Sequence, residues 1–69
     1  MDNINRLKAV LAEKGKTAKW LAESLSKDPA TVSKWCTNSY QPPVDTFVKI
    51  ANLLEVDIRE LFVSTEPKK

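Results

Sequence analysis

Residues 17–35 read TAKWLAESLSKDPATVSKW, and this stretch predicts two short helices joined by a tight turn. Thr17 is a residue type that caps helix N-termini, and the apolar residues after it recur at helical spacing over 18–25. Asp28 followed by Pro29 is a second start signal, because proline at the first helical position loses no hydrogen bond. The second helix of the pair is therefore predicted to begin at Pro29, about three residues after the first helix ends at Leu25.

The helix that starts at Pro29 has two chemically different sides. A helical projection places Val32 and Trp35 on one side, which we expect to pack into the core. The opposite side carries small, polar or basic residues: Pro29, Ala30, Ser33, Lys34 and Thr37. No bulky side chain on that side prevents a close approach to another surface. Two helices joined in this way have the length of a helix-turn-helix, whose second helix enters the major groove of DNA.

Helical periodicity continues on both sides of this pair. Before it, apolar residues at helical spacing predict a helix over roughly 4–14, with Asn3 as its cap and Gly15 as the left-handed residue after its end. After it, a fourth helix is predicted by the apolar stripe Phe47, Ile50, Ala51 and Leu54. The segment DIRE at 57–60 spaces two carboxylates like a capping box and predicts a short last helix. The predicted fold is all-α, a compact five-helix domain.

Length and composition limit the class of protein. A chain of 69 residues has room for one small domain, and 42% hydrophobic residues with a single glycine favour an ordered, helical one. We expect residues 1–63 to form this domain and residues 64–69 to be a frayed tail. No apolar run approaches the roughly 18 residues that span a bilayer, and the polar N-terminus lacks the apolar centre of an export signal. We therefore expect a cytoplasmic protein without membrane contact.

The residue types also argue against catalysis. Cys36 is the single cysteine and the chain has no histidine, so neither an internal disulfide nor a Cys/His metal site or nucleophile pair can form. We expect no enzyme activity, no metal, no cofactor and no small-molecule substrate. Cys36 lies next to the core side of its helix, which favours a buried filler over a redox switch.

The chain contains five short motifs in this order: LAE at 21–23, TVSKW at 31–35, a proline at 42, IA at 50–51 and ELF at 60–62. In this order and spacing they resemble the Xre, or lambda-repressor-like, family of helix-turn-helix regulators. The resemblance covers nearly the whole chain. It implies a lambda-repressor-like DNA-binding domain acting as a small transcriptional regulator of repressor or controller type, with a helix-turn-helix formed by the second and third helices.

The family resemblance also implies which residues meet double-stranded DNA. The recognition helix at 28–36 lies in the major groove and contacts bases through Pro29, Ala30, Ser33 and Lys34, with Thr31 at the edge. Phosphate contacts come from the start of the second helix and from the loop after the third, at Thr17, Thr37, Asn38, Ser39 and Tyr40. The sequence departs from the family at Ala18, where a glutamine is frequent, and at Ser26, where the turn commonly has glycine.

The charges are distributed unevenly along the chain. Residues 14–41 hold five lysines against two acidic residues, whereas residues 44–66 hold five acidic residues against two basic ones. The basic part contains the predicted helix-turn-helix. We therefore expect Lys16, Lys19 and Lys27 to contact DNA phosphates.

The C-terminal end is more apolar than one short helix needs. A symmetric homodimer could use this surplus, and its tentative interface comprises Ile58, Leu61, Phe62 and Val63. A dimer would read two half-sites about one helical turn apart on near-palindromic DNA. The alternative is an antitoxin-like or other protein-interaction module that holds a protein partner through Trp20 and this apolar end, with DNA binding secondary. Trp20 itself either packs on the first helix or stays open for a partner.

Overall fold

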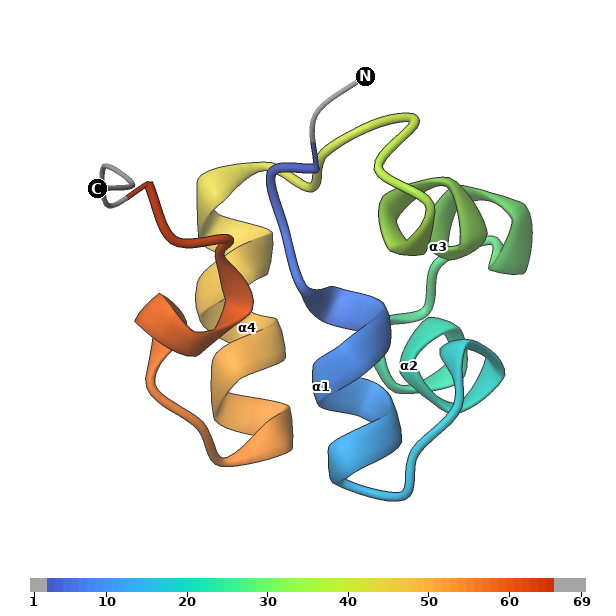
Figure 1. Cartoon of the computed structure of the whole chain (residues 1–69). Helices are drawn as coiled ribbons and strands as arrows, with labels where there is room; N and C mark the ends of the chain where they lie inside the picture. The colour runs from blue at the N-terminus through green and yellow to red at the C-terminus, as the bar shows by residue number, and fades with distance from the viewer. Residues whose placement is uncertain (1–2, 66–69) are drawn as a thin grey trace.

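The computed structural model describes residues 3–65, whose regular elements are four α-helices and one 3-10 helix (Figure 1). They are α1 (Leu7–Glu13), α2 (Ala18–Leu25), α3 (Pro29–Cys36), α4 (Val44–Leu54) and η1 (Ile58–Leu61). The predicted all-α class is confirmed, but the fifth predicted helix is a 3-10 turn of four residues. Within the part of the chain that the structure describes, no helix is long and apolar enough to cross a membrane.

The first helix is shorter than predicted because the residues before it pair with the C-terminal segment. Asn5 and Phe62 form an antiparallel bridge, and the Val63 amide donates to the Ile4 carbonyl at 2.9 Å. This extended pairing prevents residues 4–5 from continuing α1. The prediction that Asn3 caps the helix is wrong, because α1 begins at Leu7, whose amide donates to the Asn5 side-chain oxygen at 2.9 Å.

The other predicted start signals are confirmed in atomic detail. The Thr17 hydroxyl accepts a hydrogen bond from the Trp20 amide at 3.0 Å, and the Asp28 carboxylate accepts one from the Ala30 amide at 2.8 Å. Asp57 and Glu60 form the expected capping box. The element after this box stops at Leu61 because the next residue, Phe62, is already extended and paired with Asn5.

All five elements contribute apolar side chains to one core. The buried members are Leu7, Val10, Leu11, Leu21, Ala22, Val32, Trp35, Phe47, Ile50, Ala51, Leu54 and Leu61. The Phe62 ring closes one edge of this core, with its centroid 4.6 Å from that of Phe47. Figure 1 shows α1 between α4 on one side and the α2–α3 pair on the other.

Two residues of the tentative dimer interface belong to the core of the single chain instead. Leu61 is 0% exposed, and Ile58 is half-buried against the core. Neither offers the free apolar surface that we expected from sequence. Trp20 is also half-buried and packs against the core. This packing favours a structural role for Trp20 over that of an aromatic side chain left open for a protein partner. Residues 66–69 of the expected tail lie outside the described residues, and the domain limits stay a prediction.

Candidate nucleic-acid interface

The geometry of the helix pair is set by the three residues between α2 and α3. Ser26 has φ 55° and ψ 43°, the left-handed conformation that reverses a chain after a helix. The next amide, that of Lys27, donates to the Ala22 carbonyl at 2.9 Å, and Asp28 then caps α3. Serine thus adopts the backbone conformation for which glycine is the usual residue. The turn keeps α2 and α3 packed against each other.

The outward side of α3 is exposed as predicted. Val32 and Trp35 are 0% and 4% exposed, and they anchor the helix from behind. The predicted base-contact residues are all exposed: Pro29, Ala30, Thr31, Ser33 and Lys34. Their side chains are short except for that of Lys34. The backbone of α3 can therefore come close to a flat or grooved partner.

The loop after α3 folds back on the end of the helix. The amides of Ser39 and Tyr40 both donate to the Lys34 carbonyl, at 2.9 and 3.3 Å. This return places the Tyr40 ring beside the Lys34 ammonium, which lies 5.3 Å from the ring centroid. The Thr37 hydroxyl donates to the same carbonyl at 3.2 Å and lies 3.0 Å from the Ser39 hydroxyl. The structure thus brings these four predicted DNA-contact residues together.

Asn38 is the exception among the predicted phosphate contacts. Its side chain is buried, and its oxygen accepts hydrogen bonds from the Ile4 and Asn5 amides at 2.8 and 2.9 Å. Its side-chain nitrogen donates to the Asn5 carbonyl at 3.2 Å. The side chain therefore binds the segment before α1 rather than facing outward. Asn38 has φ 63°, which is a left-handed backbone conformation. Asparagine adopts this conformation more easily than most residues, and that preference is the one sequence signal of its buried structural role.

The predicted phosphate contacts near α2 lie at the surface. Thr17, Lys19 and Lys27 are exposed, and the Lys16 ammonium lies 5.0 Å above the Trp20 ring. The ion pairs among residues 3–65 join Arg6 to Glu13 and Arg59 to Asp57, so they engage none of these lysines. The cationic side chains beside the helix pair are therefore available to an anionic partner.

Two packed helices are joined by a three-residue turn that contains a left-handed residue, and the second helix exposes a side with mostly short side chains. This arrangement defines a helix-turn-helix domain. The chain belongs to the helix-turn-helix family HTH_3, whose model matches residues 7–61, and the resemblance to Xre-type regulators is confirmed. The chain is similar to a crystal structure described as that of a "putative DNA-binding protein from Bacteroides fragilis". The two are 52% identical with a TM-score of 0.85, and the match covers 87% of this chain and 97% of that chain. No curated protein matches the sequence.

Proposed function

We propose that this protein binds double-stranded DNA sequence-specifically, with α3 in the major groove, and acts as a small transcriptional regulator of repressor or controller type. The observation that carries the proposal is the exposed side of α3, whose side chains are mostly short. On the opposite side of the helix, Val32 and Trp35 are buried and anchor α3 in the core. Membership of the helix-turn-helix family and similarity to a protein described as DNA-binding support it. The function requires no catalysis and places the protein with the DNA in the cytoplasm.

In this proposal a few side chains read the bases. Lys34 donates to guanine O6 or N7, whereas the hydroxyls of Thr31 and Ser33 pair with several base edges. Pro29 and Ala30 contact thymine methyl groups. Because most of these groups are short, ordered water and DNA shape contribute to discrimination between sequences.

A second set of residues holds the DNA backbone. It comprises Lys16, Thr17, Lys19 and Lys27 near α2, and Thr37, Ser39 and Tyr40 after α3. Asn38 is left out of this set, because its side chain is buried and bonded within the protein. Phosphate contacts of this kind fix the register of the protein and make its affinity dependent on salt.

A homodimer would join two such domains on a near-palindromic operator. The apolar residues that remain exposed near the C-terminal end are Phe62 and Val63, at 37% and 38%. Ile4 adjoins Val63 through the Val63–Ile4 backbone hydrogen bond, and it is 53% exposed. We propose that these three residues form the dimer surface. Sedimentation of Phe62→Ser beside the wild type tests it, and a wild type that stays monomeric at tens of micromolar with and without DNA would count against it.

The DNA-binding proposal is tested by fluorescence anisotropy. The probes are a duplex from upstream of the protein's own gene and a scrambled duplex of the same composition, each over a salt series. Lys34→Glu should abolish the preference for the natural duplex, whereas Lys49→Glu, the same charge reversal at an exposed position of α4, should retain it. Equal binding of both duplexes by the wild type, unchanged by Lys34→Glu, would refute sequence reading by α3.

The second candidate function is an antitoxin-like protein-interaction module. It is favoured by the exposed apolar residues Val44 and Val48, 77% and 47% exposed and one turn apart on α4. Val44→Ser should then release a protein partner while leaving DNA affinity intact. Trp20→Ala is the weaker test, because Trp20 packs against the core and its loss also lowers stability. Pull-down of the wild type and Val44→Ser decides between the two functions.

A further inference from the structure

The side chain of Lys34 rests on a neighbouring aromatic ring. Its ammonium lies 5.3 Å from the centroid of the Tyr40 ring, and a cation within about 6 Å of such a centroid is attracted by the ring face. Both residues are exposed, and the ion pairs in the described part of the chain do not include Lys34. The Tyr40 ring is therefore the group that restrains this ammonium.

The position of the ring is set by the loop after α3. The Tyr40 amide donates to the Lys34 carbonyl at 3.3 Å, so the main chain ties the ring to the lysine. The loop is also anchored on both sides of Tyr40 to the segment before α1. The Asn38 side-chain oxygen accepts from the Asn5 amide at 2.9 Å, and the Gln41 side-chain oxygen accepts from the Asn5 side-chain nitrogen at 2.7 Å. Tyr40 thus projects from a loop with a fixed backbone.

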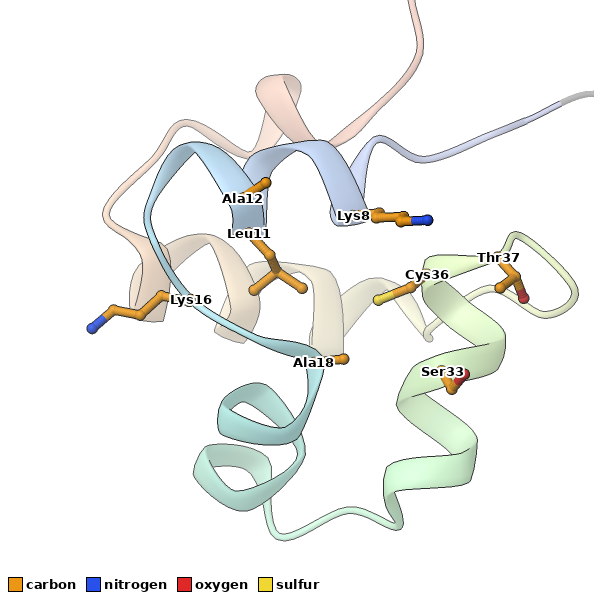
Figure 2. Close-up of a pocket in the computed structure, with 8 residues that line it drawn as sticks. All are labelled: Lys8, Leu11, Ala12, Lys16, Ala18, Ser33, Cys36 and Thr37. Atoms are coloured by element: carbon orange, nitrogen blue, oxygen red, sulfur yellow. The ribbon is translucent and has the colours of Figure 1, made fainter.

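The pair lies apart from the groove between α1 and α3. Figure 2 shows Ser33 and Thr37 on the α3 wall of that groove, and neither Lys34 nor Tyr40 is among its lining residues. Lys34 follows Ser33 directly, so its side chain leaves the helix about 100° further round. The loop after α3, rather than α1, therefore supplies the contact to its ammonium.

Restraint matters because a lysine ammonium is a mobile reader of bases. It is a point charge on a flexible four-carbon stem, and it also binds phosphates, which carry no sequence information. A guanine is read only when the ammonium is directed at O6 or N7. A ring face attracts the charge without using all three N–H donors, so donors remain for a base edge. Contact with a ring therefore limits the freedom of the ammonium and preserves its ability to read a base.

We propose that Tyr40 is the positioning residue for Lys34 and that its ring directs the lysine ammonium to a guanine of the bound duplex. The inference rests on the proposed DNA-binding function. It gives the ring a role in sequence specificity that is separate from the phosphate contact of the hydroxyl. Tyr40→Phe removes the hydroxyl and keeps the ring, whereas Tyr40→Leu removes both and keeps an apolar side chain. Because Tyr40 is 64% exposed, neither change disturbs the core.

The test is the ratio of affinities for the natural and scrambled duplexes in the anisotropy assay. An exposed cation–π contact changes an equilibrium about two- to fivefold, so Tyr40→Leu should lower the ratio by about this factor relative to Tyr40→Phe. Tyr40→Phe should weaken both duplexes equally and keep the wild-type ratio, because a phosphate contact carries no sequence information. In a Lys34→Met background the two Tyr40 variants should have the same ratio, since no ammonium is left to position.

Replacing guanines of the natural duplex one at a time by an analogue that lacks N7 identifies the base. One such replacement should weaken binding of Tyr40→Phe more than binding of Tyr40→Leu, and it should leave Lys34→Met unaffected. If no guanine behaves in this way, the inference is overturned. The contact itself is measured by the NMR shift of the Lys34 methylene next to the ammonium, which the ring current should move upfield in Tyr40→Phe but not in Tyr40→Leu.

The outcomes separate the inference from the proposed function. Equal ratios for Tyr40→Leu and Tyr40→Phe, with a wild type that prefers the natural duplex, would overturn the inference and leave the proposed function standing. The same conclusion follows if the Lys34 methylene shift does not differ between these variants, or if Tyr40→Leu lowers the ratio just as much in the Lys34→Met background. A wild type without any preference between the duplexes refutes both the proposed function and the inference.

Discussion

Replacing Asn38 by alanine should strongly destabilise the protein, and this outcome separates a buried structural role from a phosphate contact. The Asn38 side-chain oxygen accepts hydrogen bonds from the Ile4 and Asn5 amides, and Gln41 donates to it at 3.1 Å. Alanine removes this acceptor. Because Asn5 is only 2% exposed, its amide would have no water to replace the lost partner.

The expected loss follows from three contributions. An unsatisfied buried amide costs about 1–3 kcal/mol, and the lost bond to the more exposed Ile4 costs about 1 kcal/mol. Alanine in the left-handed conformation that Asn38 adopts costs about 1 kcal/mol more. The sum is about 3–5 kcal/mol. The whole stability of a chain of this length is about 3–10 kcal/mol, so Asn38→Ala removes a large part of it.

Urea unfolding, followed by the fluorescence of Trp20 and Trp35, measures this loss. With a denaturant slope near 1 kcal/mol per M for so small a domain, the midpoint should fall by about 3 M or more. Asn38→Gly should lose about 1 kcal/mol less, because glycine adopts the left-handed conformation freely. Asn38→Asp keeps an acceptor for both backbone amides, but it should also lose stability at neutral pH, because a buried carboxylate oxygen then faces the Asn5 carbonyl to which the Asn38 amide donates. Three variants with unchanged stability but weakened DNA binding would refute the buried role and restore Asn38 as a phosphate contact.

Three further changes test other parts of the fold. Leu21→Ala should lower the free energy of unfolding by about 2–5 kcal/mol in the same urea assay, because the Leu21 side chain is fully buried. Gly15→Ala should cost only about 1 kcal/mol, because Gly15 has φ +67° but no other atom lies within 4 Å of an added Cβ. Because burial raises the pKa of Cys36 in the folded state, stability should be constant below the ordinary thiol value of 9.0 and fall as pH rises above it. Cys36→Ala should remove that fall, and a wild type with no alkaline loss relative to it would contradict the assignment.

Local signals were sufficient to predict α2 and α3. Thr17 and Asp28 each bond an amide within three residues of themselves, so the start of both helices is encoded next to where it occurs. The alternation between buried Val32 and Trp35 and the exposed residues around them follows from helical period alone. For the same reason the exposed side of α3 was predictable without knowledge of the rest of the chain.

The ends of the domain depend on contacts between residues far apart in sequence, which periodicity cannot reveal. The spacing of Ile4 with later apolar residues is helical, yet the backbone at Ile4 pairs with Val63. Leu61 looked like surplus apolar area from sequence, but the fold places it fully inside the core. Asn38 looked like part of a polar surface loop, because its partners Ile4 and Asn5 lie more than thirty residues away. Each of these misses comes from the same junction of the two termini with the loop after α3.

That junction also determines how α1 and α3 are held relative to each other. The Asn5 side-chain oxygen accepts from the Leu7 amide at the start of α1, and its nitrogen donates to the Trp35 carbonyl at the end of α3 at 3.0 Å. One buried side chain thus ties the two helices together at one end, and Asn38 fixes its backbone. The base contacts that we propose for α3 need a constant position of this helix relative to the rest of the domain. Residues outside the proposed DNA-contacting set, Asn5 and Asn38, therefore fix the position of the proposed recognition helix, and the order of the terminal junction matters for binding as well as for stability.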